Sequence, residues 1–237
     1  MKLEKYAIQN TFNWILAGIT IMILAAALPG VDFAQSHSTT HARTRAVSTS
    51  ELIPPVKAYG SKDAPIRMEV FSDYQCPSCG NFFEQTLRPM TNDYVAAGKV
   101  YLVHRDFPLP MHAYSHQAAR WANAAAEIGQ FEAVDASLFD NQSSWSADGK
   151  IDKYISSVMS PVDFKRVEKI MANCGPEAVS GCPVDAWINS DIAMGKQIPV
   201  QATPTFVIYY KGQKFPAASG VVSWNVMRQF FDSLLKQ

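Results

Sequence analysis

The chain has no excess of either charge. Its 237 residues hold 21 lysines and arginines against 21 aspartates and glutamates, so the formal net charge at pH 7 is zero. Without surplus positive charge, no overall field attracts nucleic acid or anionic lipid, and we expect no nucleic-acid partner. The chain also lacks internal repeats, and it is 48% hydrophobic and 18% charged. This length and composition predict one globular domain with a sizeable core, and we expect it to carry an insertion.

The first 30 residues have the pattern of an export signal. Lys2 and Lys5 precede an apolar run from Phe12 to Leu28. The run is slightly long for the core of a signal peptide and slightly short for a membrane span, so it predicts a signal peptide or a signal anchor. Small residues at positions 25–27 favour cleavage. We therefore expect a periplasmic or other extracytoplasmic protein, either secreted or tethered to the membrane by its N-terminus.

Residues 31–54 are rich in Ser, Thr and His and have little apolar content. Such a segment cannot bury enough surface to fold, so it predicts a flexible linker. The chain has only four cysteines, and all of them follow this linker. An oxidising compartment permits disulfide bonds, whereas a cytosolic setting would favour metal-bound or reduced thiols.

Two of the cysteines follow a short apolar segment. Ile66–Phe71 has the β-rich character of a buried strand, and Cys76 and Cys79 come after it, two residues apart. Pro77 stands where the first helical residue is expected. Cys76 would then lie at a helix N-terminus, where unpaired N–H groups and the helix dipole stabilise a thiolate and lower its pKa. Cys79, one turn further on, is expected to be more shielded and to act as the resolving thiol.

Strand and helix patterns continue along the chain. Ser160 and Ser223 are each expected to cap a helix, and the second of these helices would place Val226, Phe230 and Leu234 on one side. The predicted strands are Val56–Tyr59, Ile66–Phe71, Val100–His104, Thr205–Tyr210 and Gln213–Pro216, and the predicted helices before the last are Pro77–Met90, Ala113–Ile128, Phe131–Phe139, Ile151–Met159 and Pro161–Ala172. The order is therefore β-α-β, a helical block, then β-β-α, and the strands Ile66–Phe71 and Val100–His104 are expected to run parallel.

With this order of strands and helices, the chain resembles the DsbA-like thiol-disulfide oxidoreductases of the thioredoxin-fold superfamily. The resemblance covers about Val56 to Gln237, and it is carried by Phe71–Cys79, the helical block and Ala202–Phe206. It implies an α/β thioredoxin fold, formed by residues 55–110 and 198–237, with an inserted helical domain at 111–197. It also implies that Pro204 is cis and packs against the dithiol, which would leave the Thr203 backbone free to pair with an extended substrate.

The resemblance further implies an enzyme that forms disulfide bonds in other exported proteins. Cys76 would be the nucleophile and Cys79 its partner, with Pro77 and Ser78 tuning them, and no cofactor or metal is needed. The substrates would be unfolded or reduced exported proteins. The reoxidising partner would be a quinone-linked membrane protein of the DsbB or vitamin-K-epoxide-reductase type.

Two positions depart from the pattern of the strongest oxidants in the family. Ser78 stands where those proteins carry histidine. Val70, six residues before Cys76, stands where many relatives have a buried acid that handles the proton of Cys79. The neighbouring Glu69 is expected to face the opposite side of its strand. Both departures bear on how strong an oxidant the protein is.

The other two cysteines, Cys174 and Cys182, flank a short loop rich in turn-forming residues. They predict a structural disulfide, with a second redox-active pair as the alternative. They could also complete a zinc site with Cys76 and Cys79, although their spacing is wide for one. His112 and His116 are four residues apart, but no further ligand is placed by sequence to join them, and we expect no metal site.

Two further alternatives concern function. A disulfide reductase or isomerase of the same fold is favoured by Ser78 and by Thr203 before the proline. A noncatalytic chaperone or binding module would keep a merely structural Cys76–Cys79 bond. The large aromatic residues of the helical block are expected to form its core; they are Trp121, Phe131, Trp145 and Trp187.

Overall fold

The structure is a computed structural model, and it describes residues 56–174 and 182–236. The predicted export segment and linker, as well as the loop between Cys174 and Cys182, lie outside these residues. Within them, no helix is both long and apolar enough to cross a membrane.

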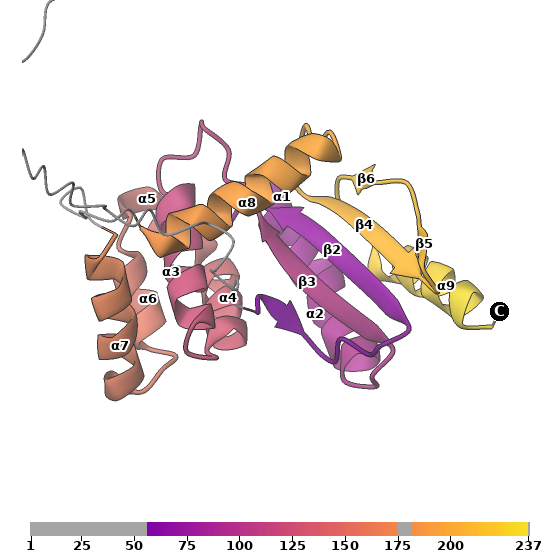
Figure 1. Cartoon of the computed structure of the whole chain (residues 1–237), viewed down its shortest axis with the longest axis horizontal. Helices are drawn as coiled ribbons and strands as arrows, with labels where there is room; N and C mark the ends of the chain where they lie inside the picture. Colours follow the sequence, from indigo (N-terminus) through magenta and orange to yellow (C-terminus); the bar gives the residue numbers. More distant parts are fainter. Residues whose placement is uncertain (1–55, 175–181, 237) are drawn as a thin grey trace, which may run out of the picture. The chain divides into compact units, whose positions relative to one another are not determined.

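A mixed sheet forms the centre of the described part (Figure 1). Its strands follow the order β1-β3-β2-β4-β5, and the short β6 also pairs with β4. β2 and β3 run parallel, as predicted, and the other pairs are antiparallel. The strands are β1 (Ala58–Tyr59), β2 (Ile66–Ser72), β3 (Val100–Asp106), β4 (Thr205–Tyr210), β5 (Gln213–Lys214) and β6 (Ala218–Ser219).

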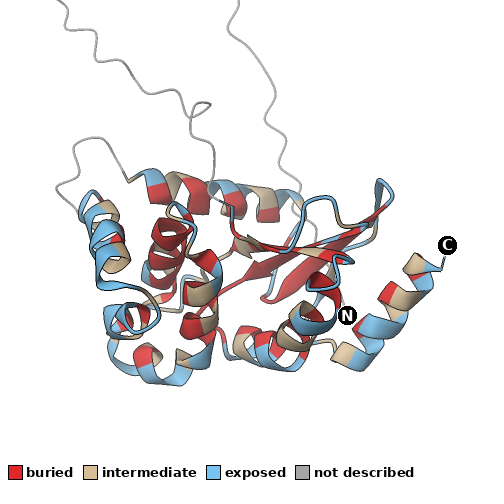
Figure 2. Ribbon diagram, turned by 90° about the horizontal axis from the view of Figure 1, so that it is seen from below, coloured by how far each residue is buried: buried red, intermediate tan, exposed pale blue. Residues whose placement is uncertain are grey.

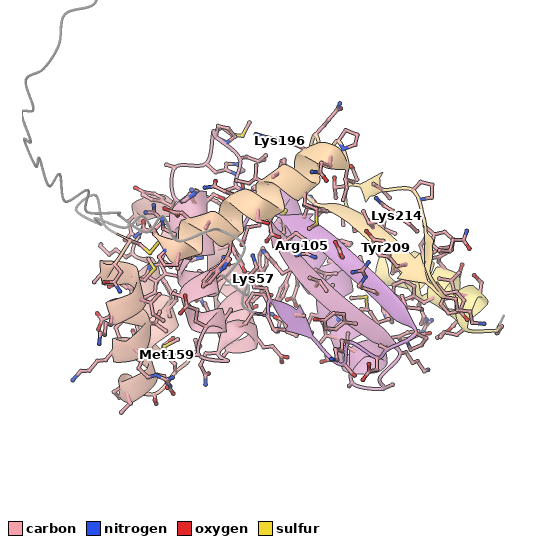
Figure 3. The ribbon with its side chains drawn as sticks, in the orientation of Figure 1. Lys57, Arg105, Met159, Lys196, Tyr209 and Lys214 are labelled. Carbon is pink, nitrogen blue, oxygen red and sulfur yellow. A yellow bond between two sulfur atoms is a disulfide. The ribbon has the colours of Figure 1, made fainter. Side chains whose placement is uncertain are left out.

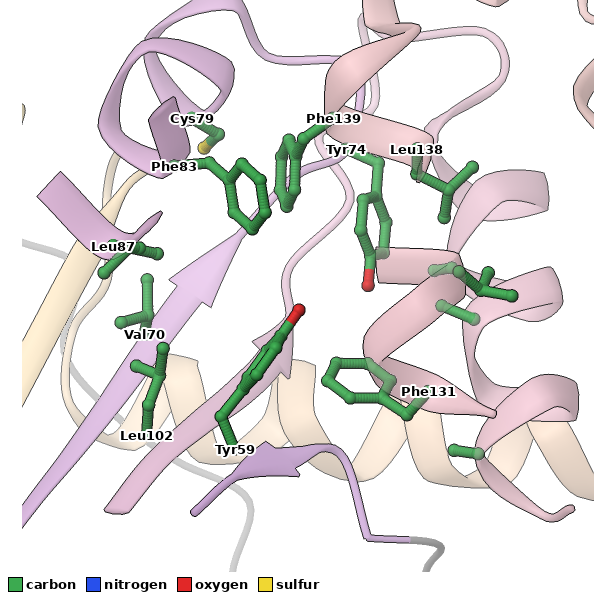
Figure 4. Packing of buried hydrophobic residues seen from close by; sticks show 14 of the residues in the cluster. Tyr59, Val70, Tyr74, Cys79, Phe83, Leu87, Leu102, Phe131, Leu138 and Phe139 are labelled. Atoms are coloured by element: carbon green, nitrogen blue, oxygen red, sulfur yellow. The ribbon is translucent and has the colours of Figure 1, made fainter. Parts of the chain in front are cut away.

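The central strand β2 is buried on both faces, and Figure 2 shows the central strands largely in the buried colour. Val70 packs into the larger core, together with Cys79 and the aromatic residues of the helices (Figure 4). Phe71 points to the other face, where Val200, Val207 and residues of α8 (Pro183–Gln197) cover it. Successive side chains of a strand point to opposite faces, so the dithiol and α8 lie on different sides of the sheet.

The helix after β2 is longer than the predicted Pro77–Met90. It consists of α1 (Pro77–Phe82), a π-helical segment η1 (Phe83–Leu87), α2 (Arg88–Met90) and a second π-helical segment η2 (Thr91–Val95). Pro89, which has no N–H to donate, lies between the two π-helical segments. The prediction that the helix ends near this proline was wrong because the wider turns carry the chain past it.

Between β3 and β4 lies the helical insertion, which confirms the predicted order of elements. Ser160 caps α7 as predicted, since its hydroxyl accepts the Asp163 N–H at 3.1 Å. The tryptophans at 121, 145 and 187 and Phe131 are buried in the insertion, as expected. The helices are α3 (Ser115–Ala126), α4 (Phe131–Asp140), α5 (Gln142–Asp148), α6 (Ile151–Ser156), α7 (Pro161–Ala172) and α8.

The last helix, α9 (Trp224–Leu235), buries Leu234 as predicted, but its other buried residues are not the predicted ones. Its buried residues are Met227, Phe231 and Leu234, whereas Val226 is 57% exposed. Both sets have helical spacing, so periodicity alone could not separate them. Packing of Phe231 near Tyr94 decided the face. Ser223 holds the N-cap position, but its side chain makes no capping hydrogen bond.

A cluster of buried charges joins the insertion to the sheet (Figure 3). Lys57, just before β1, makes ion pairs with Asp106 at the end of β3 and with Asp191 of α8; its Nζ lies 2.5 Å from Asp191 Oδ2. Arg105 donates to the other oxygen of Asp191 at 3.1 Å, and Asn123 of α3 donates to Asp106 at 2.6 Å. This cluster therefore ties four segments of the chain together beneath the surface.

Candidate active site

Cys76 occupies the N-cap position of α1, immediately after the turn that leaves β2. Its backbone is extended (φ −73°, ψ 119°), and Pro77 is the first helical residue, as the sequence predicted. The Cys76 carbonyl accepts the N–H groups of Cys79 at 3.0 Å and Gly80 at 3.2 Å. Cys76 and Cys79 are both free thiols and both buried, while Pro77 and Ser78 between them are exposed.

The pKa values of the two thiols are shifted in opposite directions. A hydrogen bond from the Cys79 thiol lowers the pKa of Cys76 to about 5; burial opposes this, and Thr203 and the backbone N–H groups of Cys79 and Ser78 reinforce it. Burial, and then the contact with Cys76, raise the pKa of Cys79 well above its usual value. The pair therefore combines one thiol that is ready to ionise with one that resists ionisation.

The low pKa of Cys76 gives a test on the reduced protein. Thiolate absorbance should titrate with a midpoint near pH 5, where an ordinary thiol would titrate near pH 9.0. Because the folded-state pKa is depressed, the thiolate stabilises the reduced fold fully above the unfolded pKa, and this stabilisation is lost as pH falls through about 5. The oxidised protein is the control, because it should show neither effect; a midpoint near 9 would contradict the assignment.

The loop before β4 lies against Cys76. The Thr203–Pro204 peptide bond is cis, and Cys76 Sγ lies 3.5 Å from the Thr203 carbonyl oxygen. The Thr203 hydroxyl is buried and has no hydrogen-bond partner in the described part of the chain. Gly220 N–H binds the Pro204 carbonyl at 2.8 Å and so fixes this loop to the strand beside it. The structure thus brings Thr203 and Pro204 to the dithiol from 127 residues further along the chain.

Sequence reasoning missed Asp73, although it lies in the run that carried the resemblance. Asp73 is 1% exposed. Its Oδ1 accepts Gln75 N–H at 2.7 Å and Ser115 Oγ–H at 2.5 Å, and its Oδ2 accepts Leu109 N–H at 2.8 Å and lies 2.7 Å from His112 Nδ1. The carboxylate therefore links the active-site turn to the loop and helix that begin the insertion.

Gln142 of α5 was missed as well. Its Nε2 donates to the Tyr74 carbonyl at 2.7 Å and to the Cys76 carbonyl at 2.9 Å. A Cβ added to Gly80 would come within 2.6 Å of Gln142 Oε1, so a side chain at Gly80 would displace it. Nothing in the local pattern around α5 marks this residue, because its partners lie more than 60 residues earlier.

The two histidines considered as metal ligands have separate partners. His112 contacts Asp73, whereas His116 Nε2 lies 3.7 Å from Asp185. Among residues 56–174 and 182–236, no group of three or more His, Cys, Asp or Glu side chains is arranged to hold a metal ion.

Cys174 and Cys182 form a disulfide between the end of α7 and the start of α8, with their Cα atoms 4.4 Å apart. The bond uses both sulfurs, so neither is free to join Cys76 and Cys79 around zinc. Val70 is buried on the dithiol side of β2, and Glu69 pairs with Arg67 at 2.9 Å on the other side, as its position in the strand predicted. No acid from β2 therefore reaches Cys79.

Comparison with known proteins places this geometry in a family. Residues 54–225 match the family model described as Thioredoxin. The structure is similar to alpha-DsbA1 of Wolbachia pipientis, with a TM-score of 0.62 and 18% identity, covering 77% of this chain and 92% of that one. It is also similar to a thioredoxin-like oxidoreductase from Silicibacter pomeroyi DSS-3, with a TM-score of 0.60, 22% identity and 78% and 95% coverage. BdbD from Bacillus subtilis has a TM-score of 0.58, with 19% identity and 77% and 94% coverage. These likenesses confirm the predicted thioredoxin fold with its helical insertion.

Curated relatives by sequence are longer proteins. The chain is 38% identical over 73 residues to Na(+)/H(+) antiporter NhaA 3 of Salinispora tropica, which is 30% of this chain and 11% of that protein. It is 28% identical over 160 residues to NhaA 1 of Mycobacterium sp. (strain KMS), which is 66% of this chain and 24% of that protein. The chain thus spans about a quarter or less of the curated relatives it matches.

Proposed function

The chain belongs to the thioredoxin family, and we propose that it is a DsbA-like thiol-disulfide oxidoreductase that forms disulfide bonds in other exported proteins. The observation that carries this proposal is the unequal pair of thiols: Cys76 has a pKa lowered to about 5, and Cys79 is 2% exposed with a raised pKa. A thiol of low pKa is a good leaving group, so the reduced enzyme is favoured and the oxidised enzyme gives up its disulfide readily.

The reaction follows from thiol exchange. A substrate thiolate attacks Cys76 Sγ in the oxidised enzyme, a substrate–Cys76 disulfide forms, and the electron pair of the broken bond goes to Cys79 Sγ. A second thiolate of the substrate then attacks the substrate sulfur that is bonded to Cys76. This closes the substrate disulfide and releases Cys76 as a thiolate. Two electrons pass from the substrate to the enzyme, and Cys79 takes up a proton from solvent.

Substrate backbone would bind beside the dithiol. The Thr203 carbonyl lies 3.5 Å from Cys76 Sγ. An extended segment of a reduced exported protein could pair with this loop in the manner of an added strand. The reduced enzyme would pass its electrons to a quinone-linked membrane protein of the DsbB or vitamin-K-epoxide-reductase type. The apolar segment at 12–28 supports an extracytoplasmic location, either after cleavage or on a tether.

A reductase or isomerase of the same fold is the second candidate. The exposed Ser78 supplies no positive charge beside Cys76, unlike the histidine of the strongest oxidants. Less thiolate stabilisation would make the enzyme a weaker oxidant. Direction of electron flow therefore separates the two candidates.

The reduction potential of Cys76–Cys79 tests the proposal. The full chain is equilibrated with a glutathione series, with Cys76→Ser as the control that reports any contribution from Cys174–Cys182. A potential nearer to about −120 mV than to about −270 mV supports a disulfide donor, and one nearer to about −270 mV supports a reductase and contradicts the proposal.

A further inference from the structure

The sulfur of Cys79 needs a partner when it leaves the disulfide as a thiolate. Cys79 is 2% exposed and lies in the larger core close to Phe83 (Figure 4). A charged sulfur is unfavourable in apolar surroundings. Val70 cannot supply a proton or a hydrogen bond, and Glu69 lies on the other face of β2.

One backbone group does point at this sulfur. The Asp73 N–H donates to Cys79 Sγ, with the nitrogen 3.5 Å from the sulfur. This contact and the Ser72 hydroxyl both act to lower the pKa of Cys79, against the effect of burial. Both groups stand at the end of the central strand, where pairing of β2 with β3 holds Ser72 opposite Asp106. A donor fixed before the reaction stabilises developing charge without having to reorganise.

The Asp73 side chain holds this N–H in place. Its carboxylate accepts hydrogen bonds from both sides of the turn: from Gln75 N–H within the turn, and from Leu109 N–H and Ser115 Oγ–H at the start of the insertion. His112 adds a fourth contact. The Asp73 carbonyl in turn accepts Cys76 N–H at 3.1 Å. One buried residue therefore connects the insertion, Cys76 and Cys79.

We propose that the Asp73 N–H receives the Cys79 thiolate during exchange, and that the Asp73 carboxylate is a positioning group that aims this N–H. The inference rests on the proposed function and assigns the step in which Cys79 leaves. When the substrate thiolate bonds to Cys76 Sγ, the Cys76–Cys79 bond breaks and its electron pair stays on Cys79 Sγ. The Asp73 N–H donates to that charge until Cys79 takes up a proton.

The test compares two reactions of the same protein. The first is the opening of the oxidised dithiol by glutathione in a single turnover, in which Cys79 must leave. The second is alkylation of Cys76 by iodoacetamide in the reduced protein, in which Cys79 does not leave. Asp73→Asn keeps the shape of the side chain but turns an amide N–H toward the Leu109 N–H. It should slow opening roughly tenfold, while alkylation stays within about twofold. Ser115→Ala removes one donor to the Asp73 carboxylate and should slow opening a few-fold.

Matched controls are Asp63→Asn and Ser190→Ala, both at exposed positions, which should change neither rate. Ser115→Ala provides the test if Asp73→Asn does not fold. Unchanged or faster opening overturns the inference, and so does equal slowing of opening and alkylation, which would indicate general damage. An unmodified protein that glutathione cannot open would instead contradict the proposed function itself.

Discussion

Replacing Cys76 by serine is expected to abolish thiol-disulfide exchange, with a loss of at least about a thousandfold. A serine hydroxyl does not ionise at neutral pH and cannot form the mixed disulfide, so no step of the reaction remains. The protein should keep its fold, because the replacement changes only the sulfur atom of Cys76 to an oxygen. The measurement is the rate at which a reduced, unfolded protein acquires disulfides.

Cys79→Ser provides the matched control. When the substrate already contains a disulfide, the Cys76 thiolate of this variant can attack that bond, form the mixed disulfide and release the other substrate sulfur as a thiolate. No Cys79 sulfur remains to displace the substrate, so the adduct should stay on Cys76 and be visible on a nonreducing gel. Cys76→Ser should show no such adduct. If Cys76→Ser retained the function of the unaltered protein, the noncatalytic chaperone or binding module would be the better interpretation.

Replacing Lys57 by methionine is expected to destabilise the fold by about 3–5 kcal/mol. Lys57 is 6% exposed and makes ion pairs with both Asp106 and Asp191. Methionine fills a similar volume but leaves two buried carboxylates without their shared cation. Arg105 would still reach Asp191, and Asn123 would still reach Asp106, so the loss is incomplete. Urea unfolding of the reduced and the oxidised protein measures it.

The pH dependence of this loss identifies its cause. Burial tends to raise the pKa of Asp106, but Lys57 and His104 outweigh it and lower that pKa below its ordinary value. A carboxyl group with a depressed pKa stabilises the fold above its unfolded pKa, and this stabilisation is lost as pH falls through the folded pKa. The difference between the unaltered protein and Lys57→Met should therefore shrink under acid conditions. A difference independent of pH would indicate lost packing instead.

Lys62→Met is the control for this prediction. Lys62 is exposed in the loop between β1 and β2, and its replacement should change the free energy of unfolding by no more than about 0.5 kcal/mol. Equal losses in the two variants would show that the buried ion pairs are not responsible.

Several features follow from residues that are neighbours in sequence. The strand Ile66–Ser72, the turn and the proline at the start of α1 place Cys76 at a helix N-terminus without help from distant residues. The same holds for Ser160 at the start of α7. Local backbone preference and capping determine where such helices begin, so the local sequence is enough to predict each helix start and the residue that occupies it. The resemblance then supplied the cis form of the Thr203–Pro204 bond and its place against the dithiol.

The errors occurred where two local patterns were equally good. In α9, Val226 and Met227 each begin a set with helical spacing, and only contact with the rest of the core makes Met227 the buried one. At Pro89, π-helical segments on either side keep the chain helical through Val95. Met90, Tyr94 and Val95 are buried there, so their contacts with the core outweigh the local preference to end the helix.

The sequence by itself determined the dithiol, the strand and helix that present it, and the division of the fold around a helical insertion. Only the tertiary structure decided what surrounds the dithiol: the carboxylate of Asp73 bound to Leu109 and Ser115, the amide of Gln142 on the Cys76 carbonyl, and Lys57 between Asp106 and Asp191. These contacts join residues 36 to 134 positions apart in the chain, the shortest from Asp73 to Leu109 and the longest from Lys57 to Asp191. A polar side chain gains such a partner only when the fold removes both from water, and no local pattern records which pair will meet.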